Sequence, residues 1–197
     1  MSCEDRGADT PIASPATPSV GAPPYGQGMQ QPVAERPHMP DYGVDTPEWT
    51  PLPWSWAAER LSGGRNYWVV TASAAGRPHA LPVWGVWDEG EQRFAFSCGP
   101  RSRKAANLAA NPQMVLAGDD TVDCLSVEGR AAVVGEPGRQ QFWIDRYLAK
   151  YRGQAAELSA EFLRANLLIE FTPERAFGVV EREDQFATRA TRWRWGS

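Results

Sequence analysis

The chain has 197 residues, which is enough for one domain of ordinary size with a substantial core. Its formal net charge of −4 at pH 7 argues against broad nucleic-acid binding, because that function usually needs a basic face. No stretch reaches the length of a membrane-spanning helix, and the beginning of the chain lacks the pattern of a secretory signal. The cysteines Cys3, Cys98 and Cys124 have no metal-ligand spacing, so we expect no metal site and reduced thiols in the cytoplasm.

Residues 1–45 differ in composition from the rest of the chain. They are dense in Pro, Gly, Ala, Ser and Thr and contain almost no large aliphatic side chains. Such a segment cannot bury enough apolar surface to offset the entropy that is lost on ordering. We therefore expect a disordered, proline-rich tail over 1–45, followed by a single domain over 46–197.

The first half of this domain alternates β-branched and aromatic runs with Gly- and Pro-containing turns, which is typical of short strands. Glycine commonly ends a helix, and the residue before a proline disfavours helical backbone. The expected elements are a helix from Trp54 or Ser55 to Gly63, strands at 66–73, 79–87 and 93–97, and a helix at 103–110.

The second half adds more strands and a helical pair with aromatic and aliphatic residues at helical spacing. The expected elements are strands at 113–117 and 123–134, helices at 138–151 and 155–164, strands at 167–172 and 175–181 joined by a proline turn, and a final strand at 188–195. Several short antiparallel strands with few helices indicate a mainly β fold, a closed barrel with helical excursions.

The strand expected at 79–87 is apolar on both faces, which predicts burial on both sides. Pro82 removes a donor from the strand ladder and suits an edge or a bulge, and Gly85 permits close backbone approach. An edge strand that is covered by a partner subunit or by a flat cofactor fits all three observations. Plain core packing with a tolerated proline fits them as well.

The helix expected at 103–110 begins among basic residues. Arg101, Arg103 and Lys104 crowd its start with no acidic residue in the first turn, although a helix N-terminus already carries partial positive charge. A bound anion, most simply a phosphate, would balance these charges. Ser102 is a good N-cap, and Ser97 ends the preceding strand where its hydroxyl could face the same ligand. The alternative is a set of solvated surface charges.

These segments together resemble the pyridoxamine-phosphate-oxidase-like split β-barrel family of flavin and deazaflavin oxidoreductases. The resemblance is carried by GRPHALPVWGVW, by FAFSCGPRSRKAANLAANP, and by the closing FTPERAFG and ATRWRW, the last two being similar to the deazaflavin-using branch. It covers roughly Trp49 to Trp195. The family implies a split β-barrel homodimer with two cofactor sites at the subunit interface.

The resemblance also implies roles for particular residues. Ser97, Ser102, Arg103 and Lys104 would hold the cofactor phosphate. Pro82, Val83 and Trp84 would line the flavin or deazaflavin ring, partly through backbone groups. Trp193 and Arg194 would contact the cofactor from the second subunit; their alternative role is barrel closure with exposed arginines.

The chain departs from the members that oxidise pyridoxine phosphate, because it lacks their Arg–x–His element near the C-terminus. Its only histidines are His38 and His79, so vitamin B6 synthesis and haem handling are not expected. The resemblance implies a coenzyme F420-dependent oxidoreductase that transfers a hydride to or from a small, flat, hydrophobic substrate. FMN with the same fold, or a non-catalytic carrier, remain alternatives, and no side chain is identified as catalytic. Arg65, Arg77 and Arg101 are candidates for binding the polyglutamyl tail of coenzyme F420.

Overall fold

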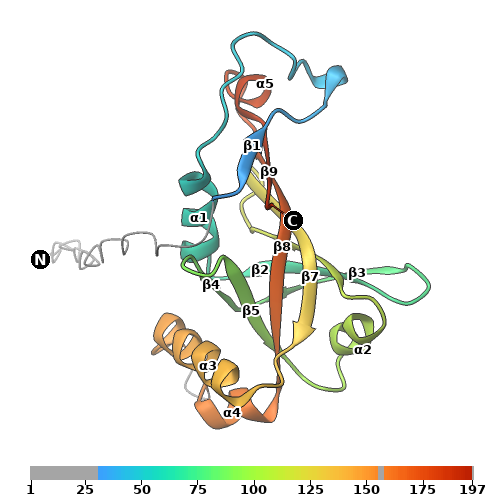
Figure 1. The fold of residues 1–197 in the computed structure, drawn as a ribbon, viewed down its shortest axis with the longest axis vertical. Helices are drawn as coiled ribbons and strands as arrows, with labels where there is room; N and C mark the ends of the chain where they lie inside the picture. The colour runs from blue at the N-terminus through green and yellow to red at the C-terminus, as the bar shows by residue number, and fades with distance from the viewer. Residues whose placement is uncertain (1–30, 155–157, 197) are drawn as a thin grey trace, which may run out of the picture.

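A computed structural model describes residues 31–154 and 158–196. The described chain forms one antiparallel sheet with several helices around it (Figure 1). The strands are β1 Val33–Glu35, β2 Tyr67–Ala72, β3 Pro78–Val83, β4 Gly85–Asp88, β5 Arg93–Cys98, β6 Gln113–Ala117, β7 Asp123–Val133, β8 Leu167–Val180 and β9 Thr191–Arg194. The helices are the 3-10 turn η1 Pro40–Tyr42, α1 Trp54–Gly63, α2 Arg103–Ala110, α3 Pro137–Tyr151, α4 Ala160–Ala165 and α5 Phe186–Arg189. None of these helices is long and apolar enough to cross a membrane.

The sheet runs in the order β1-β9-β8-β7-β6-β2-β3, and β5 adds to β8 and also pairs with β4. One edge of β8 therefore serves two strands: its first part pairs with β5 and its last part with β9. A single residue, Trp84, connects β3 to β4, although these strands pair with different neighbours, β2 and β5. The sheet path that starts at β8 therefore leads through β7, β6, β2 and β3 and, by way of Trp84, β4 and β5, back to β8. Between β3 and β4 the connection is the peptide chain and not a set of strand hydrogen bonds.

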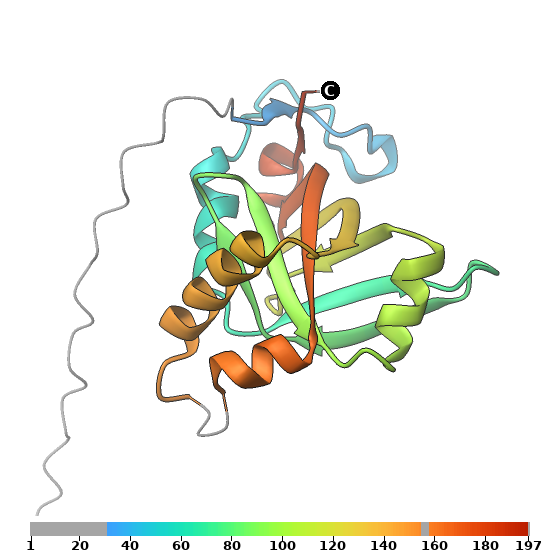
Figure 2. The ribbon, with the colours of Figure 1, turned by 60° about the horizontal axis from the view of Figure 1, so that its bottom comes forward.

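Two apolar clusters stabilise this arrangement. The larger cluster fills the inside of the curved sheet, where Tyr67, Phe94, Phe96, Phe171 and Trp193 are almost fully buried. The second cluster lies where α3 and α4 cover β4, β5 and the start of β8 (Figure 2), and it contains Trp143, Ile144, Tyr147, Tyr151 and Leu163. Burial of each such side chain contributes about 1.5–3 kcal/mol to folding.

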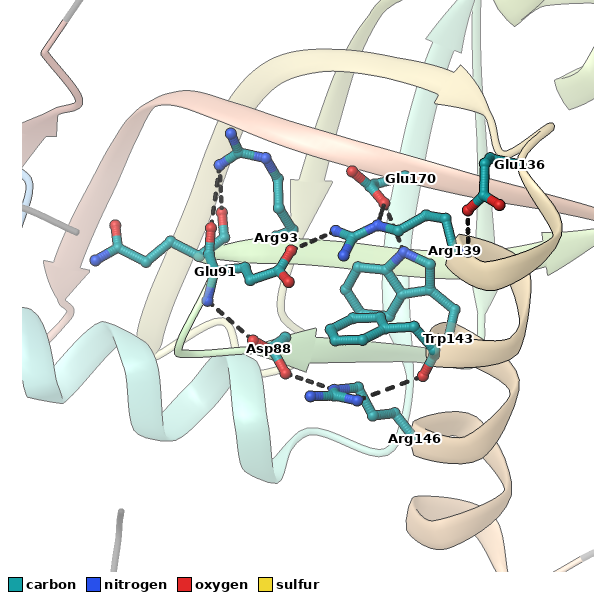
Figure 3. Close-up of polar contacts among 10 residues, drawn as sticks. Asp88, Glu91, Arg93, Glu136, Arg139, Trp143, Arg146 and Glu170 are labelled. Atoms are coloured by element: carbon teal, nitrogen blue, oxygen red, sulfur yellow. Dashed lines mark hydrogen bonds and ion pairs between the residues drawn. The ribbon is translucent and has the colours of Figure 1, made fainter. Parts of the chain in front are cut away.

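Ion pairs fix α3 against this side of the sheet (Figure 3). The guanidinium of Arg139 lies 2.6 Å from the carboxylate of Glu170 on β8 and 2.5 Å from that of Glu91. Glu170 also accepts a hydrogen bond from the indole N–H of Trp143. Two turns after Arg139 on α3, Arg146 pairs with Asp88 at the end of β4. Charged groups on one face of α3 thus set its position along the β4–β5 hairpin.

Two glycines are required by close packing. A Cβ at Gly85 would lie 2.0 Å from the ring of Phe94, and a Cβ at Gly129 would lie 2.1 Å from the carbonyl oxygen of Thr172. Gly129 sits where the β7–β8 register shifts, so that Glu174 has no direct partner and Pro173 lies beside the bulge. Proline is tolerated in a sheet at such positions.

Most predicted elements match closely; the helix predicted at 103–110 has the observed bounds Arg103–Ala110. Four predictions differ. The helix expected at 155–164 is observed only as α4, Ala160–Ala165, and residues 155–157 of that prediction lie outside the described part. The strand expected at 79–87 is two strands broken at Trp84, because its halves pair with different neighbours. The strands expected at 167–172 and 175–181 are one continuous β8, because the bulge accommodates Pro173. In place of one strand over 188–195, the chain has α5 and then β9.

The domain also extends further toward the N-terminus than composition suggested. Within 31–45, the part of the expected tail that is described, β1 pairs with β9 and the side chain of Val44 is fully buried. Backbone hydrogen bonds to an existing strand order a segment that is poor in apolar residues, so composition alone misplaced this boundary. Residues 1–30 lie outside the described part.

Candidate functional site

The β2–β3 hairpin and the start of α2 enclose a basic pocket of about 250 Å³. It is lined by Ser73, Arg77, Pro78, His79, Arg103 and Asn107, with no acidic side chain among them. Arg103 and Asn107 are four residues apart on α2 and therefore share one face of the helix. The amide of Asn107 donates to the buried hydroxyl of Thr71 at 2.9 Å, which fixes α2 against β2. The pocket thus rests on a rigid support.

The basic pocket has the donors that an anion needs. Among the described residues, neither Arg77 nor Arg103 forms an ion pair, so both guanidinium groups are available. The Nδ1 atom of His79 is buried and has no hydrogen-bond partner in the same part of the chain. Buried polar atoms are rarely left without a partner, and such exceptions call for an explanation. An anionic group such as a phosphate would satisfy this donor set.

A second, apolar pocket of about 370 Å³ lies between β5 and the helices α3 and α4. Its lining residues are Trp84, Ser97, Cys98, Gly99, Tyr147, Leu158, Phe162, Leu163 and Asn166. None of them carries a charge. Aromatic and aliphatic walls with a few polar groups are typical of pockets that bind flat organic molecules.

The break between β3 and β4 is held from behind by two tyrosines of α3. The hydroxyl of Tyr147 donates to the carbonyl of Trp84 at 2.8 Å. The hydroxyl of Tyr151 accepts from the N–H of Gly85 at 2.8 Å and lies 2.8 Å from the carbonyl oxygens of Gly85 and Arg65, one of which can take its proton. The Trp84 ring stacks on the Tyr151 ring with centroids 4.7 Å apart. Nearly every polar group at this break therefore has a partner.

Lys150 precedes Tyr151 on α3, and its side chain reaches the same β3–β4 break. Its amine donates to the hydroxyl of Tyr67 at 2.7 Å and to the carbonyl of Gly85 at 2.9 Å. Burial lowers the pKa of Lys150 to about 8. Burial also raises the pKa of Tyr151 to about 12 and the pKa of Tyr67 and Tyr147 further, so these hydroxyls stay protonated.

The structure distributes the predicted phosphate ligands over this region. Arg103 lines the basic pocket, whereas Ser97 lines the apolar pocket. Ser102 is the N-cap of α2, and its hydroxyl accepts from the N–H of Ala105 at 3.2 Å. Lys104 is half-buried on the next position of the helix. Of the four predicted phosphate ligands, Arg103 thus lines the basic pocket and Ser97 lines its neighbour.

The residues predicted to line a ring follow one another along the end of β3. Pro82 is exposed and pairs with Trp68 of β2, Val83 is buried, and Trp84 is half-buried at the break. Because β3 pairs with β2 alone within the described chain, Pro82 lies on an edge strand. From His79 to Trp84 the strand rises by roughly 17 Å, so the basic pocket and the break lie at opposite ends of β3.

The two C-terminal residues predicted to contact a cofactor face opposite ways. Trp193 is fully buried between Trp54 and Trp56, so within this chain it presents no surface to a ligand. Arg194 is exposed and pairs with Glu35 at 2.5 Å. Both lie far from Ser97, because the partner of Trp193 on β8 is eight residues beyond the partner of Ser97, roughly 26 Å along the strand.

Sequence reasoning missed His79 and the α3 residues Tyr147, Lys150 and Tyr151 as members of the site. The tyrosines have the four-residue spacing of one helix face, which indicated packing on the sheet and nothing more specific. Lys150 offered a faint signal as one of two lysines in a chain that otherwise uses arginine. Its burial depends on β2 and β4, which only the fold brings to α3.

The sequence model of the pyridoxamine 5'-phosphate oxidase family matches residues 57–180. No curated protein matches the chain. Among solved structures, it is similar to the conserved hypothetical protein Rv2991 from Mycobacterium tuberculosis, with a TM-score of 0.55, 18% identity, and 76% of this chain and 88% of that chain covered.

Two further structures have the same fold. An F420 reductase has a TM-score of 0.50 and 20% identity, with 64% of this chain and 98% of that chain covered. ChuZ from Campylobacter jejuni has a TM-score of 0.52 and 12% identity, with 64% and 55% covered. At such identities the structural matches show the fold alone. The match of the family's sequence model spans more than half of the chain, which therefore belongs to the pyridoxamine 5'-phosphate oxidase family.

Proposed function

We propose that the protein is a cytoplasmic oxidoreductase that uses coenzyme F420 and acts as a split-barrel homodimer. The observation that carries this proposal is the basic pocket beside the start of α2, where two guanidinium groups and the Nδ1 atom of His79 have no partner among residues 31–154 and 158–196. A reductase named for F420 shares the fold, which supports the choice of a deazaflavin. FMN is the alternative, because its phosphate needs the same donors.

In the proposed complex, Arg77, His79 and Arg103 hold the cofactor phosphate, with Ser102 and Lys104 at the helix start. The ring lies at the other end of β3 on Pro82, Val83 and Trp84. Ser97 and Tyr147 then face the space next to the ring, in the apolar pocket.

When bound, the reduced cofactor supplies a hydride, that is, two electrons and a proton, to an electron-poor carbon of the substrate, which then gains a second proton from solvent. The protein binds and orients. The uncharged walls of the apolar pocket exclude water and favour a flat, hydrophobic substrate over a charged one. Tyr147 and Tyr151 keep the β3–β4 break in place and remain protonated while doing so.

The second subunit would cover the outer face of the sheet. Trp68 is 44% exposed there and lies beside the exposed Pro82 on β3, so the two residues offer apolar surface to a partner. In this arrangement Arg192 and Arg194, which alternate with the buried Trp193, are the C-terminal side chains able to reach a partner's cofactor. Sedimentation analysis of Trp68→Glu tests this: we expect a monomer with weakened cofactor binding.

The test of the function is a parallel titration with coenzyme F420 and with FMN, followed by ligand fluorescence. We expect selective binding of the deazaflavin. The double variant Arg77→Ala/Arg103→Ala should bind it about 100-fold more weakly, because it loses two charge-assisted contacts. Arg164→Ala, which removes an exposed arginine of α4, is the matched control and should bind normally. Preference for FMN would move the protein to the flavin branch, and binding of neither would sink the proposal.

Turnover separates an enzyme from a carrier. Reduced coenzyme F420 is mixed with excess menadione, a neutral flat quinone, and cofactor oxidation is followed by absorbance under anaerobic conditions. An enzyme consumes many equivalents of quinone per protein when the cofactor is regenerated. Tight binding without turnover of menadione or of an enone panel would favour a carrier.

A further inference from the structure

Lys150 is a half-buried cation with which no carboxylate of the described residues forms an ion pair. Its amine is held by two neutral oxygens, the Tyr67 hydroxyl and the Gly85 carbonyl. The rings of Tyr67 and Tyr151 lie 4.8 and 5.5 Å from its nitrogen. Removing an ammonium from water without a counter-ion costs free energy, which cation–π contacts offset only in part.

The groups that touch the Lys150 amine are neutral. From β2 it faces the protonated Tyr67, and from α3 it faces Tyr151. Arg65, which precedes β2, lies over the Trp84 ring at 5.2 Å, and its charge acts on Tyr151. Asp119, in the β6–β7 connection, is the carboxylate whose charge reaches Tyr67, and it forms no contact with Lys150. The Lys150 amine is thus a positive charge in direct hydrogen-bond contact with the backbone of the β3–β4 break.

The amine lies close to the part of the chain to which the proposed function assigns the cofactor ring. Its bond to the Gly85 carbonyl places it within roughly 8 Å of the Trp84 backbone, by ordinary bond lengths. A ring packed on Val83 and Trp84 would lie on the order of 10 Å from the charge. Two-electron reduction by a hydride adds one negative charge to such a ring before any protonation.

We propose that the Lys150 ammonium stabilises the reduced form of the ring bound at the β3–β4 break and so makes the bound cofactor a weaker hydride donor and a better acceptor. Lys150 is a positioning and electrostatic residue, not a catalytic one. Across about 10 Å at an effective dielectric constant of about 20, one unit charge favours the negative form roughly tenfold. This inference rests on the proposed cofactor site.

The test compares dissociation constants for the oxidised cofactor and for the cofactor reduced with dithionite, measured anaerobically with coenzyme F420 and with FMN. In Lys150→Met, the ratio of oxidised to reduced Kd should fall about tenfold, equivalent to about 30 mV for a two-electron couple. Lys150→Arg retains the charge and should keep most of the ratio. Arg152→Gln removes an exposed cation two residues away and should leave the ratio unchanged, because solvent screens that charge.

The pH dependence provides a second readout. Burial lowers the pKa of Lys150 to about 8, so its amine is charged at pH 7 and loses its charge as the pH rises through about 8. The difference between wild type and Lys150→Met should therefore disappear between pH 7 and 9. If Lys150→Met does not fold, the test uses wild type alone. Its ratio of oxidised to reduced Kd, corrected for the pH dependence of the free cofactor, should fall about tenfold between pH 7 and 9, and a constant ratio would overturn the inference.

An equal loss of affinity for both redox forms in Lys150→Met would show a purely structural role and overturn the inference. An unchanged ratio at pH 7 would overturn it as well. Wild-type protein that binds neither cofactor would instead refute the proposed function, so the two failures are distinguishable.

Discussion

The two ends of β3 are built in different ways. At its start, His79 and its arginine neighbours surround the basic pocket with donors that lack partners in the described chain. At its end, the tyrosines of α3, the amine of Lys150 and the packed Gly85 satisfy the backbone at the break and hold it rigidly. One end has unused hydrogen-bonding capacity, and the other has almost none.

This difference separates binding from support. Charged groups without a partner are tolerated where a ligand can pair with them, and precise geometry is needed where a flat ring has to be positioned. If so, changes at the end of β3 should cost mainly stability, whereas changes at its start should cost mainly affinity.

The largest effect is expected from Gly85→Ala. The new methyl group would overlap the ring of Phe94, which is fully buried and cannot move away. We expect the free energy of unfolding to fall by about 3 kcal/mol or more, as for severe overpacking. Urea denaturation measures it, and Gly63→Ala, where a Cβ meets nothing within 4 Å, is the control. Equal stability of the two variants would show that the end of β3 is not rigid.

Tyr151→Phe should have the next largest effect. The change removes the acceptor of the Gly85 N–H and leaves that buried group unsatisfied, which costs about 1–3 kcal/mol. The stacking against Trp84 is retained, so lost packing contributes little. Chemical denaturation gives the stability, and faster amide hydrogen exchange at Gly85 than elsewhere in β4 would locate the defect. A stability within 0.3 kcal/mol of wild type would contradict the role given to this hydroxyl.

Arg139→Ala tests the outer support of α3 (Figure 3). Burial acts to raise the pKa of Glu170, but hydrogen bonds from Arg139 and Trp143 outweigh it and hold the pKa below its usual value. A depressed carboxyl pKa contributes stability above the unfolded pKa, near 4.5, and this contribution is lost as the pH falls through the folded value. We expect a loss of about 1–2 kcal/mol at pH 7 that shrinks below about pH 4.

Thermal unfolding of Arg139→Ala and wild type between pH 3 and 7 measures this convergence. Arg164→Ala serves as control, since its side chain is exposed and bonds only the amide of Gln141 among the described residues. A gap between variant and wild type that stays constant down to pH 3 would exclude the ion pair as its source.

The smallest effect on stability is expected for Arg77→Ala at the other end of β3. Arg77 is exposed and makes no side-chain hydrogen bond within the described chain, so unfolding should change by less than about 0.5 kcal/mol. Cofactor affinity should nevertheless fall at least tenfold. Calorimetric unfolding and fluorescence titration of the same sample provide both numbers, and a variant that loses stability but not affinity would reverse the assignment.

Local sequence predicted the elements whose signals are local. The N-cap Ser102 and the Asn111–Pro112 stop defined α2, and the basic residues at its start indicated an anion site. The family could also be inferred, because its segments are short and ordered along the chain. The expectation for Arg103 is consistent with the basic pocket, while the binding roles themselves stay predictions.

What sequence could not supply depends on long-range pairing. A strand apolar on both faces gave no sign that it breaks at Trp84, since the break follows from pairing with both β2 and β5. Lys150 joins the site through Tyr67, 83 residues earlier in the chain. Trp193 and Arg194 looked equivalent in sequence, but alternation along β9 buries one and exposes the other.

The shared edge of β8 has a consequence for how the protein is made. β5 and β7 cannot complete their pairing until β8 has been synthesised, and β1 cannot pair until β9 has followed. Val33 therefore pairs with Arg194 only when almost the whole chain is available. Such distant contacts slow folding, because loop-closure entropy is lost before the contacts form. During synthesis, β2, β3 and β6 would therefore leave the ribosome with an incomplete sheet, and the exposed edges of these strands are where a chaperone would be needed most.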